Sequence, residues 1–278
     1  MTNHKHLLFL LPALLFMALT FLFPLFQVLI ESLTDAAGSF SVEAYKSEVF
    51  SPLFAKFIRN TLTISILCTV FTLCISYPIA FHLSRQSARR RAVLLSLVML
   101  PFWTSILVKS FAFTALLGES GTVNKLIQFL LGEEFSVKLL FNRTGVIIGM
   151  VHHFIPFMVL PILGSLLAQD TNLTNAAKIM GAGNTRIFWK ITLPLSLPGV
   201  FAGVFLTLIL SIGFFVTPAL LGGPKDQMIA QLVDIYAQET LNWTGASAIS
   251  VVLFVMSVFL IAIMSRMPGG QSIWGSSH

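Results

Sequence analysis

Long apolar segments alternate with short polar ones along almost the whole chain. Each apolar segment is long enough to cross a bilayer as a helix, which takes about 20 residues. The first apolar segment is longer than the hydrophobic core of a signal peptide and lacks a small-x-small cleavage pattern, so we interpret it as a retained span. The pattern predicts an all-α membrane protein with one transmembrane domain over residues 1–278 and six transmembrane helices, at about 7–30, 61–83, 92–117, 144–168, 195–221 and 246–265.

Composition supports this interpretation. Hydrophobic residues make up 56% of the chain and charged residues only 10%, with a mean hydropathy of +0.88, whereas soluble domains are about 25% charged. The net charge of +6 does not indicate a nucleic-acid partner, because the basic residues do not gather on a polar domain with interleaved aromatic residues. Cys68 and Cys74 lie six residues apart in one apolar segment and predict neither a metal site nor a disulfide.

The distribution of charge predicts the orientation in the membrane. If both termini lie in the cytoplasm, the loops on that side carry nine basic residues and one acidic residue, whereas the outer loops carry seven basic and ten acidic residues. Short cytoplasmic loops of membrane proteins are enriched in Lys and Arg. The cytoplasmic set is Lys5, Arg85, Arg89, Arg90, Arg91, Lys178, Arg186, Lys190 and Arg266, with Asp170 as the acid.

The outer loops at 31–60, 118–143 and 222–245 are long enough for a docking surface. Short helices are expected there, for example at Ser41–Lys46 and Thr122–Leu131, lying along the membrane surface.

No segment carries a catalytic motif. The nearest approach to a nucleotide-binding loop, Gly118 to Lys125, has the wrong spacing and lacks the Ser or Thr. A serine elbow, a His-Glu-x-x-His helix and paired carboxylates within a span are absent from the sequence. The chain is therefore not expected to be an enzyme, and no cofactor or metal is expected in it.

A polar, basic segment at 170–194 separates two apolar ones. Asp170 or Thr174 is suited to cap a short helix that Gly181 and Gly183 end. A second turn, capped by Asn184 and ended by Pro194, would place an apolar stripe on the membrane surface. Ala176, Ala177 and Gly181 would form a ridge of small residues that fits a groove on a partner protein.

The spacing of Ala176-Ala177, Gly181, Ile191 and Leu193-Pro194 resembles the cytoplasmic coupling loop of permease subunits in ATP-binding-cassette importers. That family usually has Glu where this chain has Asn175, so a neutral hydrogen bond would replace a charged contact. The resemblance implies a coupling helix that contacts a separate ATPase through Asn175, Ala176, Ala177, Lys178, Gly181 and Arg186.

Three further segments resemble the spermidine/putrescine branch of these permeases: Leu100–Phe111 with Leu116–Gly118 and Asn124, Ile155–Pro161, and Gly213–Gly223. The resemblance covers roughly 60–265 and implies a type I importer fold in the bacterial inner membrane. It also implies a second, different permease subunit, an ATPase dimer that binds ATP and Mg, and a periplasmic substrate-binding protein.

Ionisable and aromatic residues within the spans are the candidates for the substrate pathway. Lys109 could instead extend to the outer interface, and one of His152 and His153 could make only a structural polar contact. With 26 Phe in the chain, most must face lipid or the core. The candidates are Trp103, Thr104, Lys109, Phe111, His152, His153, Phe214 and Phe215.

The predicted function is therefore that of a permease subunit importing a small organic cation, with a polyamine as the first choice, by alternating access. Other solutes of related importers, such as opines or amino-phosphonates, remain open. An ion-coupled secondary carrier would require a carboxylate at mid-membrane, and every acid in this chain lies in a loop or at the end of a span.

Overall fold

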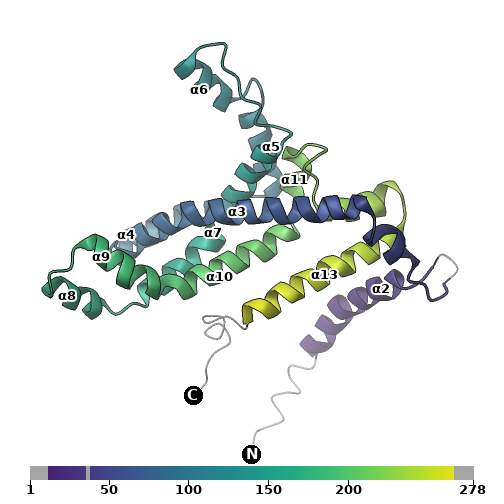
Figure 1. The fold of residues 1–278 in the computed structure, drawn as a ribbon, viewed down its shortest axis with the longest axis horizontal. Helices are drawn as coiled ribbons and strands as arrows, with labels where there is room; N and C mark the ends of the chain where they lie inside the picture. The colour runs from purple at the N-terminus through teal and green to yellow at the C-terminus, as the bar shows by residue number, and fades with distance from the viewer. Residues whose placement is uncertain (1–11, 36–37, 266–278) are drawn as a thin grey trace, which may run out of the picture. The chain divides into compact units, whose positions relative to one another are not determined.

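The structure is a computed structural model that describes residues 12–35 and 38–265 (Figure 1). Every regular element of these residues is helical, apart from one isolated bridge between Thr34 and Phe40. Six helical segments are long and apolar enough to span a membrane, which confirms the predicted class and the number of spans. Residues 7–11 of the first predicted span lie outside the described residues. The six segments are Pro12–Ser32, Pro52–Ser84, Ile106–Leu131, Arg143–Leu167, Asn184–Ile212 and Trp243–Ile263.

The chain divides into two compact units, residues 1–58 with 229–256 and residues 59–228 with 257–278. The single transmembrane domain expected over residues 1–278 therefore stays a prediction.

The first unit contains the N-terminal span and most of the last one. Its helices are α2 (Phe23–Ser32), the beginning of α3 (Pro52–Ser84), α12 (Ile229–Asp234) and most of α13 (Trp243–Ser265), with π-helical turns at Ala18–Leu22, Tyr45–Val49 and Ile235–Glu239. Buried apolar side chains of α3, α12 and α13 form its core: Phe54, Phe57, Ile229, Leu232 and Ile249.

The second unit contains the rest of α3 and the helices that follow it, up to the loop before α12. These are α4 (Ala88–Trp103), α5 (Ile106–Leu117), α6 (Thr122–Leu131), α7 (Arg143–Leu167), α8 (Thr171–Ile179), α9 (Asn184–Ile187), α10 (Leu193–Ile212) and α11 (Val216–Leu221). Helix α6 has the bounds expected from the sequence.

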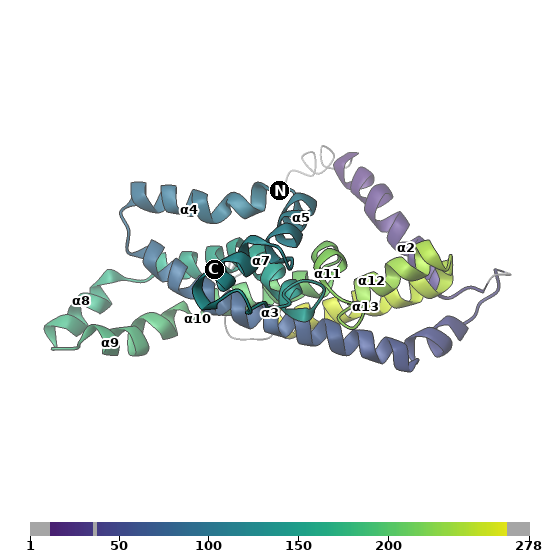
Figure 2. The same cartoon turned by 90° about the horizontal axis from the view of Figure 1, so that it is seen from above.

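Helices α7 and α10 pack closely because glycines remove the side chains between them (Figures 1 and 2). A Cβ on Gly199 would lie 2.4 Å from the Pro161 carbonyl oxygen, and one on Gly203 would lie 2.7 Å from the Met158 sulfur. Gly199 and Gly203, four residues apart on α10, thus lie at the helix contact. Buried residues of α3 and α7, including Leu83, Met158 and Ile162, complete the core beside it.

The third predicted span, 92–117, is not one continuous helix. It divides into α4 and α5 at Thr104 and Ser105, whose backbone is extended (Figure 2). Pro101 lacks an N–H for the helical ladder, and the Thr104 hydroxyl donates to the Leu100 carbonyl over 2.8 Å. The break leaves the last carbonyls of α4 available to other donors.

The fifth predicted span, 195–221, is likewise divided. Helix α10 ends at Ile212, and α11 begins at Val216 after a break at Gly213–Phe215. At the other end the expectation that Pro194 ends a turn is wrong: α9 continues through a π-helical turn, Phe188–Thr192, into α10. Pro194 directly follows this π-helical turn, where the backbone hydrogen-bond pattern changes, and the helix passes through it.

Candidate functional site

Lys109 on α5 makes two polar contacts inside the second unit. Its ammonium donates hydrogen bonds to the Pro101 carbonyl, at the end of α4, and to Nδ1 of His153 on α7, over 3.0 Å. An ammonium only donates, so Nδ1 accepts and the imidazole is neutral, with its proton on Nε2. Lys109 thus joins α4, α5 and α7 through neutral acceptors.

Aromatic rings surround His153. The His153 ring centre lies 4.9 Å from that of Phe214, 5.1 Å from that of Phe154 and 5.9 Å from that of Phe157. Phe102 at the end of α4 adds a further ring, 5.7 Å from Phe157. We call Lys109, His153 and these four phenylalanines the Lys109 cluster.

The structure brings together only three of the eight candidate pathway residues, namely Lys109, His153 and Phe214. Trp103 contacts the cluster only through Phe102 and is 80% exposed, and Phe111 is 60% exposed. Thr104 is exposed and bonds its own helix. Phe215 is half-buried at the N-cap of α11.

His152 points elsewhere from His153, as expected for adjacent positions on a helix. Its ring lies 5.2 Å from that of Phe113, beside an apolar hollow of about 510 Å³. Its buried Nδ1 has no hydrogen-bond partner among the described residues.

Three members of the cluster, Phe102, Phe154 and Phe157, were absent from the sequence candidates. Phe154 follows His153 directly on α7 and Phe157 lies about one helical turn further on, so spacings of one and four residues from that histidine could have identified them. Phe102 gave no such signal, because the break after α4 decides where its ring lies.

The second group of candidates lies in α8, α9 and the turn between them. Asp170 is the N-cap of α8, and its carboxylate accepts from the Asn172 N–H over 2.9 Å, as one of the two expected caps. Gly181 ends the helix with φ +81°, a backbone conformation that favours glycine. Gly183, rather than the expected Asn184, is the N-cap of α9.

The small-residue ridge is only partly exposed. Ala177 is buried, whereas Asn175, Ala176, Lys178, Gly181 and Arg186 are exposed. Next to them the apolar side chains of Ile179 and Met180 are 88% and 80% exposed.

Part of the predicted apolar stripe, Ile187 and Phe188, packs within the protein. Ile187 is 3% exposed, and the Phe188 ring meets those of Phe81 and Tyr77 on α3 edge to face, at 5.2 and 6.0 Å. These contacts hold the segment against α3.

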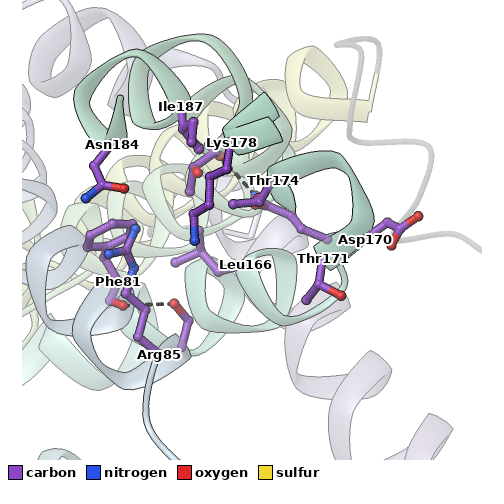
Figure 3. Close-up of a pocket in the computed structure, with 12 residues that line it drawn as sticks. Phe81, Arg85, Leu166, Asp170, Thr171, Thr174, Lys178, Asn184 and Ile187 are labelled. Atoms are coloured by element: carbon purple, nitrogen blue, oxygen red, sulfur yellow. Dashed lines mark hydrogen bonds between the residues drawn. The ribbon is translucent and has the colours of Figure 1, made fainter. Parts of the chain in front are cut away.

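A hollow of about 360 Å³ separates α8 from the end of α3 (Figure 3). Lys178 extends into it from α8, on the side where Phe81 and Arg85 lie, and Asn184 faces it from α9. The Arg85 guanidinium carbon lies 4.0 Å from the centre of the Phe81 ring, a cation–π contact. The basic turn after α3 and the α8–α9 segment therefore share one end of the unit.

Within residues 12–35 and 38–265 there is no group of three His, Cys, Asp or Glu side chains placed to hold a metal ion.

Comparison with known proteins gives a consistent result. Residues 72–267 match the family model described as binding-protein-dependent transport system inner membrane component. The spermidine/putrescine transport system permease protein PotB of Haemophilus influenzae is 33% identical over 262 residues, covering 90% of this chain and 91% of that protein. The putative 2-aminoethylphosphonate transport system permease protein PhnU of Salmonella typhimurium is 27% identical over 266 residues, covering 94% and 92%.

Among solved structures, a chain of a bacterial ABC transporter involved in the import of the acidic polysaccharide alginate has a TM-score of 0.75 at 20% identity. The match covers 95% of this chain and 96% of that one. At this identity the likeness concerns the fold.

Proposed function

This chain belongs to the family of binding-protein-dependent transport system inner membrane components, and we propose that it imports a small organic cation, a polyamine, by alternating access. It is a permease subunit of an ABC importer, a transport component of the inner membrane rather than an enzyme. Family membership removes the ion-coupled carrier from consideration.

The α8–α9 segment is the proposed contact with the ATPase. The observation behind this role is the pair Ile179 and Met180, two large apolar side chains that stand 88% and 80% exposed at the tip of a polar, basic segment. Exposed apolar groups with a polar rim are typical of protein interfaces. Lys178 and Arg186 beside them would contact acidic groups, and Asn175 would donate or accept a neutral hydrogen bond.

The proposed orientation places this segment and both termini in the cytoplasm. Arg85 and Lys178 line the same hollow, so two basic loops that are far apart in sequence lie at one end of the second unit. The positive-inside rule assigns such an end to the cytoplasm.

The Lys109 cluster is the observation that carries the cargo proposal. Its two acceptors, a carbonyl oxygen and an imidazole nitrogen, already hold an ammonium. Three phenylalanine rings contact the His153 ring, and that of Phe102 contacts Phe157. Aromatic faces attract organic ammonium groups. The similarity to a protein named for spermidine and putrescine supports the same class of cargo.

A second cargo has its own supporting observation. The positive charge of Lys109 would bind a phosphonate, and one relative is named for 2-aminoethylphosphonate. An amino-phosphonate is therefore the alternative cargo.

The proposed assembly contains a second, different permease subunit, two ATPase subunits and a periplasmic binding protein. The spermidine/putrescine branch that this chain resembles pairs two permeases, which favours the heterodimer.

Uptake measured in cells tests the proposal. Labelled spermidine, putrescine and 2-aminoethylphosphonate are supplied to cells that contain the whole transport system, with and without this chain. Loss of energy-dependent polyamine uptake on deletion is the expected result. Polyamine uptake that persists while 2-aminoethylphosphonate uptake disappears would replace the polyamine by the amino-phosphonate.

A further inference from the structure

Lys109 lies among helices without an acidic residue. The sequences of α4, α5, α7, α10 and α11 contain no Asp or Glu. An ammonium within a membrane is costly unless it is paired or hydrogen-bonded. Here the Pro101 carbonyl and His153 Nδ1 provide that bonding, and we name these two atoms the ammonium acceptor pair.

The break between α4 and α5 makes the first acceptor available. Pro101 is among the last four residues of α4, whose carbonyls lack intrahelical partners because the helix ends at Trp103. The partial negative charge at the end of a helix favours a cation there. The neighbouring carbonyl, that of Leu100, already accepts from the Thr104 hydroxyl.

The second acceptor is fixed in position by its aromatic contacts. The His153 ring contacts Phe214, which follows α10, and Phe154 and Phe157 on its own helix. These rings orient Nδ1 toward Lys109, and they form the apolar wall that the methylene groups of an alkylammonium would contact.

From this geometry we infer that the ammonium acceptor pair is a binding site for a free organic ammonium, occupied by Lys109 when no cargo is present. The inference rests on the proposed function and deepens it. A cargo amine that replaces Lys109 makes the same two hydrogen bonds, so the acceptors stay satisfied in both states. Neutral acceptors hold the amine without the desolvation cost of a carboxylate that would be unpaired whenever the site was empty.

Removal of the lysine side chain tests the inference. In Lys109→Ala the acceptor pair is empty, so added ethylammonium is expected to raise the thermal unfolding midpoint of the purified whole transporter in nanodiscs. Wild-type protein, in which ethylammonium must first displace Lys109, should show a smaller increase at the same concentration. Ligand that binds only the folded state shifts unfolding in proportion to the logarithm of its concentration.

Three further variants make the result specific. Lys125→Ala removes an exposed lysine of α6 and should respond to ethylammonium as wild type does. Lys109→Ser, whose short side chain also leaves the acceptor pair empty, replaces Lys109→Ala if the latter does not assemble. In Lys109→Ala/His153→Phe the rings remain but one acceptor is lost, and the affinity for ethylammonium should fall about tenfold, as expected for loss of one hydrogen bond to a charged group.

The outcomes separate the two proposals. If ethylammonium does not stabilise the Lys109→Ala transporter, the ammonium site is overturned. If methylphosphonate stabilises the wild-type transporter but not Lys109→Ala, the ammonium site is also overturned and Lys109 is an anion ligand. Failure of wild-type cells to import polyamines would overturn the proposed cargo alone, because the stability measurement does not depend on transport.

Discussion

Nε of Arg143 lies 3.0 Å from Oδ1 of Asp226, so the first residue of α7 is paired with the loop that follows α11. Asn60 on α3 joins the same network. Its side-chain oxygen accepts from Arg143 Nη2 over 3.3 Å, and its amide donates to the carbonyls of Lys225 at 2.7 Å and Gln227 at 3.2 Å. The network ties three segments together at the end of the second unit opposite the basic turn.

We expect Asn60 to stabilise this network more than the ion pair does. The Arg143 side chain is 41% exposed, and such pairs contribute about 0–1 kcal/mol. Asn60 is 5% exposed, and Asn60→Ala would leave two carbonyls without their donor, at about 1–3 kcal/mol for a buried group. Thermal unfolding of the detergent-purified complex should therefore show a larger decrease for Asn60→Ala than for Asp226→Asn. The reverse order would make the ion pair the principal contact.

Gly181→Arg should leave membrane insertion intact and abolish uptake, because it places a large side chain at the proposed ATPase contact. A Cβ at Gly181 meets no atom within 4 Å, so the second unit itself has room for it. Gly181→Asn is the matched control, since Asn tolerates a positive φ better than other residues and adds little bulk. Normal uptake by Gly181→Arg would show that the contact lies elsewhere.

Two glycines that face different surroundings should respond in opposite directions to the same substitution. Gly199→Ala forces a Cβ to within 2.4 Å of the Pro161 carbonyl oxygen and should destabilise the protein by about 1–3 kcal/mol through overpacking. Gly164→Ala on α7 meets nothing within 4 Å and should stabilise the helix by up to about 1 kcal/mol. The two unfolding midpoints, compared in one detergent, decide whether the α7–α10 contact requires glycine.

The adjacent histidines of α7 should differ in their effect on transport. His153→Ala removes an acceptor of Lys109 and the ring beside Phe214, so uptake should decrease roughly tenfold, the effect of losing one hydrogen bond to a charged group. His152→Ala should leave uptake kinetics unchanged because that ring contacts Phe113 beside an apolar hollow. A changed KM for His152→Ala would place His152 in the pathway.

Alkaline pH should weaken the first unit through Tyr236. Burial, the hydrogen bond that the Tyr236 hydroxyl donates to Glu48, and the Glu48 charge together raise the pKa of Tyr236 to about 12, with burial as the largest cause. The folded state therefore holds this proton more tightly than the unfolded state, whose pKa is about 10. The stabilisation is complete below pH about 10 and is lost as the pH rises toward about 12.

Tyr236→Phe removes that titration. Unfolding midpoints should decrease less for Tyr236→Phe than for wild type between those two pH values, while the variant is less stable at neutral pH. Equal pH dependence in the two proteins would show that Tyr236 does not contribute to it.

The sequence by itself determined the class, the number of spans and the ends of helix α8. These properties follow from local features: apolar length sets a span, Asp170 caps α8 where the chain turns, and Gly181 supplies a positive φ that other residues avoid. Each of these features depends on a few residues that are neighbours in the sequence, so it can be predicted without knowledge of the tertiary structure.

The tertiary structure alone decided which pathway candidates meet. Lys109 and His153 are 44 residues apart, and their contact exists because α4 breaks after Trp103 and α5 turns toward α7. Nothing in the local pattern distinguishes His153 from His152, or Phe214 from the exposed Phe111. Which face of a helix is covered depends on the packing of helices that are distant in sequence, and an all-apolar span carries little periodicity to reveal it.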